Sequence, residues 1–114
     1  MSSSEAYCPD RGDLIWLDND PTRGHEQSGH RPGLVLSPRA YNVRSGLCLV
    51  APITSRRTKY SFDTALPEGL GVAGLVISDQ VSSKSWAQRR SRFIGTAPRA
   101  LVDDVVAKFR TLLP

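Results

Sequence analysis

The sequence predicts one mainly β domain, a small half-open barrel closed by a C-terminal helix. The chain has only 114 residues, its apolar segments have the length of strands, and an amphipathic helical stripe stands at its C-terminal end. A chain of this length forms one core, because independent domains usually need about 100 to 150 residues. Its serine-rich start is polar. We therefore expect a flexible N-terminus over residues 1–10 and a single domain over residues 11–114.

Five or six short segments have the composition of strands. They lie at residues 13–18, 33–37, 47–54, 60–65 and 72–81, with a further short segment at 93–95. Alternation places Leu14 and Ile15 on opposite faces of the first segment, and we expect both faces to be covered. Pro52 is expected to break the hydrogen-bond ladder near the end of the third segment, because proline has no N–H to donate.

The connecting segments differ in character. Residues 20–32 are polar, contain two glycines and two prolines, and predict a long exposed loop, which in a small domain is more often functional than decorative. Residues 38–46 predict a turn or short helical excursion, and residues 82–90 predict a connector with one tryptophan. The terminal helix starts near Pro98. Its apolar stripe comprises Leu101, Val102, Val105, Val106, Phe109, Leu112 and Leu113.

The net charge of +4 is unevenly distributed along the chain. The first 36 residues carry three arginines and six acids, whereas residues 37–99 carry ten basic residues and three acids. Twelve of the fifteen basic residues are arginine, whose planar fork grips phosphate or carboxylate with two hydrogen bonds. This bias favours a nucleic-acid partner, the alternative being a basic but inert surface.

Other classes of protein are disfavoured by composition. No apolar run approaches the roughly 20 residues that span a bilayer, and the polar start lacks the features of an export signal. We therefore expect a cytoplasmic protein without a membrane contact. Cys8 and Cys48 have no metal-ligand spacing and are expected to be free thiols. Neither a disulfide nor a metal is expected at these cysteines.

Polar residues in the 20–32 loop and at strand ends can carry chemistry. Cleaving an RNA phosphodiester without a metal requires a base, an acid and fixed donors for the charge on the phosphorus oxygens. His25 can exchange a proton near neutral pH, and Glu26 or Asp79 can act as a base if desolvated or can pair with an arginine. For His30, an ordinary solvated loop position is the alternative, and for Asp79 a turn or salt-bridge role.

Seven short phrases in the sequence resemble the signature of the MazF/PemK toxin family. They are Gly12–Asp18, Asp20–Gln27, Gly29–Pro32, Val35–Pro38, Tyr41–Asn42, Pro52–Thr54 and Asp79–Val81. Each phrase is weak alone, but the match is collinear and covers about nine-tenths of the chain.

The resemblance implies an SH3-like barrel of the CcdB/MazF/PemK type that forms a homodimer. It implies cofactor-independent cleavage of single-stranded RNA at short motifs, leaving 2′,3′-cyclic phosphate and 5′-hydroxyl ends, and a cognate MazE-like antitoxin as partner. The family's Arg-Pro pair and Pro-x-Thr strand correspond to Arg31 and Thr54, which are expected to be catalytic together with Glu26 of the loop. Arg31 would hold the pentavalent phosphorus, and Thr54 would bond a phosphate oxygen.

Three further residues are expected to be auxiliary: His25, Asp79 and Gln80. PemK-type members combine the loop histidine with an Arg-x-Asp group on the fifth strand. Here Asp79 is present, but Ile77 stands in place of the arginine. The resemblance therefore favours a MazF-like arrangement.

Two basic runs are expected to line a groove that tracks the RNA backbone, with a solvated charged surface as the alternative. They comprise Arg56, Arg57 and Lys59 in the first run, and Arg89, Arg90 and Arg92 in the second. Trp16 and Trp86 can stack on bases, although packing in the core or in a dimer is favoured in so small a domain.

Two other functions stay open from the sequence. One is a topoisomerase poison of the same fold, as in the CcdB branch, whose members act through a C-terminal Trp-Gly-Ile, whereas this chain ends in Leu112-Leu113-Pro114. The other is a catalytically silent SH3-like module that binds nucleic acid or protein. Whether Arg31 and Thr54 converge on one site separates this module from an enzyme.

Overall fold

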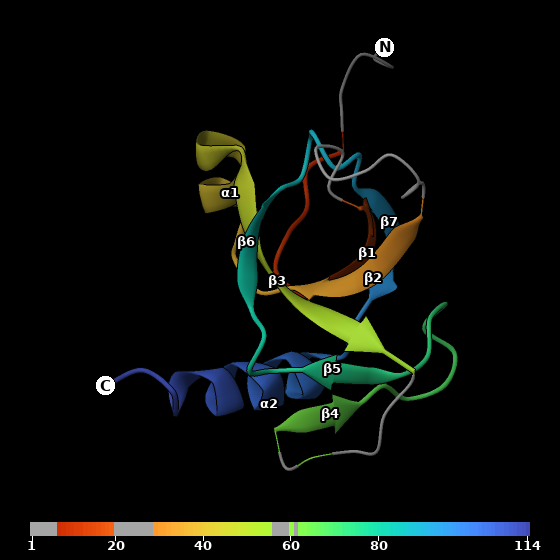
Figure 1. Cartoon of the computed structure of the whole chain (residues 1–114), viewed down its shortest axis with the longest axis vertical. Helices are drawn as coiled ribbons and strands as arrows, with labels where there is room; N and C mark the ends of the chain where they lie inside the picture. Colours follow the sequence, from red (N-terminus) through yellow and green to blue (C-terminus); the bar gives the residue numbers. More distant parts are fainter. Residues whose placement is uncertain (1–6, 20–28, 56–59, 61) are drawn as a thin grey trace.

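The computed structural model describes residues 7–19, 29–55, 60 and 62–114. Within these ranges the chain forms seven strands and two helices (Figure 1). The strands are β1 (Asp13–Asp18), β2 (His30–Val35), β3 (Leu47–Thr54), β4 (Asp63–Ala65), β5 (Leu75–Ile77), β6 (Ser82–Ser85) and β7 (Arg92–Thr96), and the helices are α1 (Arg39–Ser45) and α2 (Arg99–Arg110). The strand order is β4-β5-β3-β2-β1-β7, with β6 also paired to β3 and every pair antiparallel. The predicted mainly β, half-open barrel with a C-terminal helix is confirmed.

Strand β3 is the centre of the sheet and changes partner along one edge. Its first half pairs with β6, from Leu47 opposite Ser85 to Val50 opposite Ser82. Its last two residues pair instead with β5, and its other edge pairs with β2. The sheet therefore divides around β3 into a ring that contains β1, β2, β6 and β7 and a smaller layer of β4 and β5 beside α2 (Figure 1).

Side chains on both faces of the sheet are buried. One core cluster contains Leu14, Leu34, Leu36, Ala51, Ile53, Val76, Ala97, Leu101, Val102 and Val105, and the other contains Ile15, Leu17, Val35, Cys48 and Val50. Neighbours such as Leu14 and Ile15 fall into different clusters, as strand alternation requires. Each full burial of a leucine or valine side chain stabilises the fold by about 1.5 to 3 kcal/mol, which explains the apolar runs in β1 and β3 and the apolar end of β2.

Helix α2 is tied to β4 by a polar network as well as by its apolar face. The Thr64 hydroxyl donates to the Asp104 carboxylate at 2.6 Å. The Lys108 ammonium donates to the Thr64 hydroxyl at 2.9 Å and to the Asp63 carbonyl at 3.0 Å, and it forms an ion pair with Asp104. These bonds fix the β4–β5 layer against α2.

The second strand and the segment at 82–90 differ from the sequence prediction. Strand β2 starts at His30 and not at Gly33, so the last residues of the predicted 20–32 loop belong to a strand that pairs with β1. Residues 82–85, predicted as part of a connector, form β6. Both segments are polar and pair through their backbones, so neither shows the apolar alternation that indicates a strand.

The fourth and fifth strands are shorter than predicted. β4 begins at Asp63, because the Asp63 carboxylate accepts the N–H of Tyr60 and closes a turn before it. The predicted strand at 72–81 is confined to β5, which a turn at 78–81 separates from β6. Pro52 does not interrupt β3, which continues to Thr54, but it lies where one edge of β3 changes from β6 to β5.

Residues 7–10, which lie within the segment predicted to be flexible, contact the domain. Pro9 is fully buried, and its carbonyl accepts the amide of the buried Asn42 side chain at 2.9 Å.

Trp86 packs on the second core cluster, as predicted, and its indole N–H donates to the Asn42 carbonyl at 2.9 Å. At the other end, Leu112 and Leu113 of the predicted helical stripe follow α2 and are 48% and 57% exposed.

Both cysteines are free thiols, as predicted. Across the described ranges, no helix combines the length and the apolar character required to cross a membrane.

The Cys48 thiol provides a test of the second core cluster. Its side chain is fully buried, and burial raises the pKa of the thiol to about 12, with a smaller contribution from Cys8. Alkylation requires the thiolate, so iodoacetamide at pH 8 should leave Cys48 unlabelled in the native protein. Peptide mass spectrometry with and without urea measures this, and rapid native labelling of Cys48 would contradict its burial.

The same pKa shift gives a sign for the pH dependence of stability. In the unfolded chain the Cys48 thiol ionises near pH 9, whereas in the folded protein it keeps its proton to about pH 12. The unfolded state therefore binds fewer protons in this window, and the free energy of unfolding should fall as the pH rises through it. The free energy of unfolding, measured by urea titration at several pH values between 8 and 11, should fall less steeply with pH for Cys48→Ala than for the parent.

Candidate active site

The sheet opens where strands β2 and β3 stop pairing with each other. Leu34 pairs with Ala51 and Gly33 with Pro52, and the ladder ends there. Pro32 and Pro52 have no N–H, so neither can donate a ladder bond at this point. Beyond it, β2 is still paired to β1, and β3 is paired to β5. A cavity of about 760 Å³ is lined by both strand ends.

Arg31 and Thr54 line this cavity from the two strands. Alternation along β2 places Arg31 on the same face as Val35, and alternation along β3 places Thr54 on the same face as Val50. Val35 and Val50 are paired and belong to one core cluster. The guanidinium and the hydroxyl therefore face the same side of the sheet, and continuing the β2–β3 register by two residues would place them opposite each other.

The Arg31 side chain is available to an anion. It is exposed, and within the described part of the chain it makes no hydrogen bond or ion pair. Arg90 and Arg92, by contrast, both pair with Asp18 at 3.1 Å. The hydrogen bond from Arg90, and that from Arg92, hold the pKa of the Asp18 carboxyl below its usual range. Asp18 thus partly compensates the charges of Arg90 and Arg92, whereas the charge of Arg31 is not compensated.

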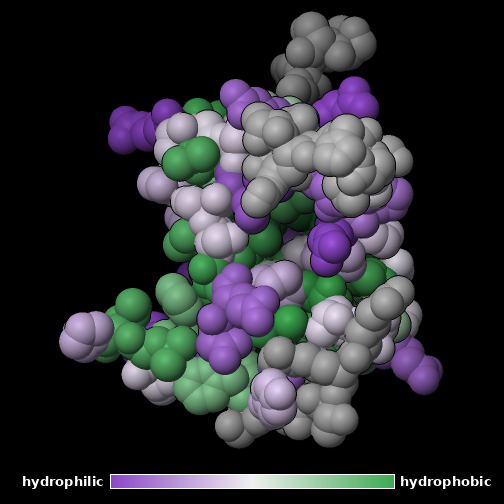
Figure 2. All heavy atoms as spheres, in the orientation of Figure 1, coloured by the Kyte–Doolittle hydropathy of each residue, from purple (hydrophilic) through white to green (hydrophobic). Residues whose placement is uncertain are grey.

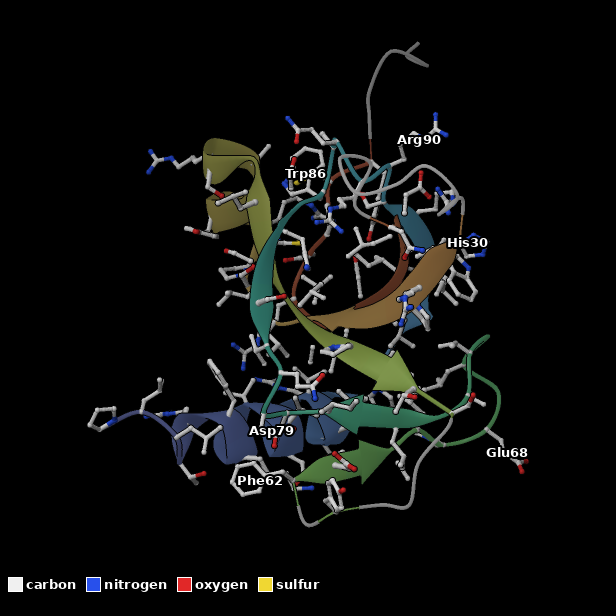
Figure 3. The ribbon with its side chains drawn as sticks, in the orientation of Figure 1. His30, Phe62, Glu68, Asp79, Trp86 and Arg90 are labelled. Carbon is white, nitrogen blue, oxygen red and sulfur yellow. The ribbon has the colours of Figure 1, made fainter. Side chains whose placement is uncertain are left out.

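His30 stands beside Arg31 at the rim of the cavity. It begins β2, and its ring meets the Trp16 ring edge-on, with centroids 4.7 Å apart. Figure 3 shows His30 at the outer end of β2. The contact with Trp16 orients the imidazole, although its ring is exposed to solvent. Trp16 is only partly buried and belongs to neither core cluster, so of its two predicted roles in packing, the one in a dimer stays a prediction.

A second cavity of about 270 Å³ adjoins the first one. The two share the lining residues Asn19, Arg31, Pro32, Pro52 and Gln80. The second cavity adds Lys84 from β6 and Arg89, whose guanidinium donates to the Asp18 carbonyl at 3.4 Å. We call the two cavities together the Arg31 groove. Three cations line it against one carboxylate, that of Asp18, so its electrostatic character is positive.

The structure separates the remaining predicted site residues. Gln80 lines both cavities, whereas Asp79 is exposed and lines neither. Asp79 follows the end of β5 that leads away from Thr54, far from His30 in Figure 3. Arg90 also lines neither cavity and is paired with Asp18. The residues predicted at His25, Glu26, Arg56, Arg57 and Lys59 lie outside the described residues.

Sequence reasoning missed several polar residues of the groove, among them Lys84 and Asn19. Lys84 lies in β6, which was predicted as part of a connector. The Ser82–Ser85 segment is polar throughout, so it has no apolar alternation that would indicate a strand. Asn19 directly follows β1 and lines both cavities. Its position directly after the Gly12–Asp18 phrase was the available signal. In the part of the chain that the structure describes, no three His, Cys, Asp or Glu side chains gather as metal ligands.

An open β-barrel with a cationic groove across its strand ends, lined by an unpaired arginine and a threonine from the same face of the sheet, defines a small protein suited to binding a phosphate-bearing polymer. Residues 10–113 match the model of the PemK-like, MazF-like toxins of type II toxin–antitoxin systems. The chain belongs to this family, as the resemblance predicted.

Named relatives agree with the family match. The chain is 43% identical over 107 residues to the endoribonuclease toxin MazF of Escherichia coli (strain K12), covering 94% of this chain and 96% of the relative. It is 33% identical over 110 residues to endoribonuclease PemK of Escherichia coli, covering 91% and 81%. The crystal structure of MazF from Deinococcus radiodurans matches with a TM-score of 0.84 at 46% identity, covering 94% of this chain and 97% of that one. A MazE–MazF structure from the same organism matches with a TM-score of 0.84 at 41% identity, covering 94% and 96%.

Proposed function

We propose that this protein is an endoribonuclease toxin that cuts single-stranded RNA in the Arg31 groove. Membership of the toxin family and the endoribonuclease activity named for its relatives in Escherichia coli support the reaction class. The observation that carries the site is the shared cavity, which an unpaired Arg31 and the hydroxyl-bearing Thr54 line from two strands. The similarity to named endoribonucleases favours this function over the topoisomerase-poison alternative.

The reaction is an internal transesterification. The ribose 2′-oxygen forms a bond to the adjacent phosphorus, the bond from phosphorus to the 5′-oxygen breaks, and the products are a 2′,3′-cyclic phosphate and a 5′-hydroxyl. Arg31 holds the phosphorus oxygens as negative charge grows on them, and the Thr54 hydroxyl donates to one of these oxygens. We assign proton transfer from the 2′-hydroxyl and to the leaving oxygen to the loop residues His25 and Glu26.

The second part of the groove suits the neighbouring nucleotides. Lys84 and Arg89 can neutralise phosphates next to the one that is cut, and the amides of Asn19 and Gln80 can hydrogen-bond to base edges. Leu17 and Val50 supply an apolar floor on which an unstacked base can lie. We propose that this part of the groove contributes to the choice of RNA motif, together with the predicted basic run at Arg56, Arg57 and Lys59.

The proposal includes two protein partners. The solved MazE–MazF complexes of Deinococcus radiodurans support a MazE-like antitoxin as partner of this chain, and a disordered acidic segment would complement the positive groove. A second copy of the chain is the other partner. Figure 2 shows hydrophobic side chains gathered at the lower left, at the C-terminal end, where the exposed Leu112 and Leu113 offer apolar surface to cover. We place the toxin in the cytoplasm, where its RNA substrate occurs.

Replacing Arg31 tests the catalytic assignment. Arg31→Ala should lose about 2.7 to 4 kcal/mol of transition-state stabilisation, a roughly hundred- to thousand-fold fall in rate, while part of the RNA affinity remains. The cut site is first mapped on a long RNA with end-group analysis, and rates are then measured on an oligoribonucleotide that carries it. Arg44→Ala, which removes an equally exposed arginine on α1, is the control. Equal rates for Arg31→Ala and the parent would refute the role of Arg31.

Chelation tests whether a metal ion helps to stabilise the negative charge that grows on the phosphorus oxygens. Because a guanidinium and a hydroxyl supply the donors in the proposed reaction, cleavage of a short unstructured RNA should continue at an unchanged rate in EDTA. Loss of cleavage in EDTA, with recovery on adding Mg²⁺, would show that a metal ion takes part.

Salt dependence tests the second part of the groove. If Lys84 neutralises one phosphate, Lys84→Gln should reduce the slope of log affinity against log salt by about 0.7 for single-stranded RNA. The ligand is the cleavable oligonucleotide with a 2′-deoxy residue at the cut site, and binding is measured by fluorescence anisotropy at several salt concentrations. Arg44→Gln should leave the slope unchanged, and an unchanged slope for Lys84→Gln would place the RNA elsewhere.

A further inference from the structure

Gly74 lies directly against the backbone of Thr54. It immediately precedes β5, in which Leu75 pairs with Thr54. A Cβ added at Gly74 would lie 2.5 Å from the Thr54 carbonyl oxygen, 3.0 Å from its carbonyl carbon and 3.2 Å from Cγ2 of Ile53. Real side chains do not approach backbone atoms this closely, and no change of rotamer relieves a contact between two backbones. The close approach of β5 to Thr54 therefore requires glycine at this position.

The backbone of Gly74 is also held on its other side. The N–H of Leu66 donates to the Gly74 carbonyl at 3.0 Å, and Ala65 pairs with Leu75. Gly74 is thus enclosed between the end of β4 and the end of β3. A side chain there displaces one of these two neighbours.

The β4–β5 side of this contact is held in place by hydrogen bonds and by burial. Thr64 is hydrogen-bonded to Asp104 and Lys108 of α2, and Val76 of β5 is fully buried in the larger core cluster. Thr54 is the last residue of β3 and lines the cavity, so on this side an added Cβ meets the wall of the site. A side chain at Gly74 therefore moves Thr54 relative to β5, and any shift of Thr54 changes the position of its hydroxyl in the cavity.

We propose that Gly74 is a positioning residue for RNA cleavage: by carrying no side chain, it lets β5 set the backbone of Thr54 so that its hydroxyl faces the scissile phosphate. The inference rests on the proposed function of Thr54 and deepens it. Ala73, next to Gly74, lines the same cavity, so this turn forms part of the wall of the site as well as its support.

Two other glycines provide control positions, where a substitution introduces backbone strain but no contact with Thr54. Gly74 has a φ of +136°, which L residues rarely adopt, so any substitution there is strained as well as crowded. Gly69 has a φ of +90° and nothing within 4 Å of an added Cβ, and Gly71 has a φ of +91° with its Cβ facing the Ile94 side chain. Gly69→Ala and Gly71→Ala therefore carry strain in the same loop without touching Thr54.

The experiment is a double-mutant cycle in the full-length protein. The kcat and KM of Gly74→Ala, Thr54→Ala and the double variant are measured at 10 °C on the mapped oligoribonucleotide, with folded populations verified by circular dichroism. We expect kcat of Gly74→Ala to fall about ten- to a hundred-fold, the cost of a displacement of about 1 Å. KM and the affinity for the 2′-deoxy oligonucleotide should stay within about two-fold, because the cations that hold the RNA backbone, Arg31, Lys84 and Arg89, make no contact with Gly74. Gly69→Ala and Gly71→Ala should keep the parent kcat.

The Thr54→Ala background distinguishes positioning from a general structural effect. If Gly74 acts through Thr54, Gly74→Ala should lower kcat no further once the hydroxyl is gone. A parent-like kcat for Gly74→Ala, or an equal fall in both backgrounds, would overturn the proposal. If Thr54→Ala itself cleaves at the parent rate, the proposed role of Thr54 fails, an outcome visible without any Gly74 variant.

A second variant covers the case in which Gly74→Ala does not fold. Serine is the next smallest side chain, and its Cβ meets the same Thr54 oxygen, so Gly74→Ser should show the same fall in kcat. Failure of both variants to fold, while Gly69→Ala and Gly71→Ala do fold, would assign Gly74 to the stability of the whole domain and overturn the positioning role.

Discussion

The sharing of β3 between two groups of partners is the constraint on which the rest of the structure depends. A strand has two edges, and β3 uses one for β2 and divides the other between β6 and β5. Pro32 and Pro52 cannot donate ladder bonds, so the β2–β3 ladder ends while each strand remains held by its outer partner. The sheet must open at this point, and the opening is lined by Arg31 and Thr54. The candidate site is therefore a consequence of how the sheet is partitioned.

Charge pairing decides which cations of this basic chain face the opening. Asp18 at the end of β1 engages the side chains of Arg90 and Arg92, whose positive charge is then partly compensated. Arg31 and Lys84 have no such partner within the described residues. One carboxylate thus compensates Arg90 and Arg92, while Arg31 and Lys84 remain available in the groove. A potential concentrated in a cleft attracts a polyanion more strongly than the same charge spread over a convex surface.

Much of the fold could be predicted from local patterns, and the exceptions share one cause. β1 and β3 were predicted with their observed bounds, because residues buried on both faces leave continuous apolar runs. β6 and the start of β2 were missed, since Ser82–Ser85 and His30-Arg31-Pro32 are polar and pair only through backbone groups that every residue possesses. In the site, Arg31 and Thr54 were indicated by family phrases, but Lys84 and Gly74 were not, because their roles depend on what lies across from them.

The sequence by itself determined the composition of two core faces, the amphipathic C-terminal helix, the excess of arginine and the family phrases that single out Arg31 and Thr54. These are properties of consecutive residues, which periodicity and composition record. Only the tertiary structure decided that Gln80 and not Asp79 faces the groove, that Arg90 is paired while Arg31 is not, and that β5 rests against Thr54 through a glycine. Those outcomes depend on which strands meet and in what register, and that is set by the packing of segments far apart in the chain.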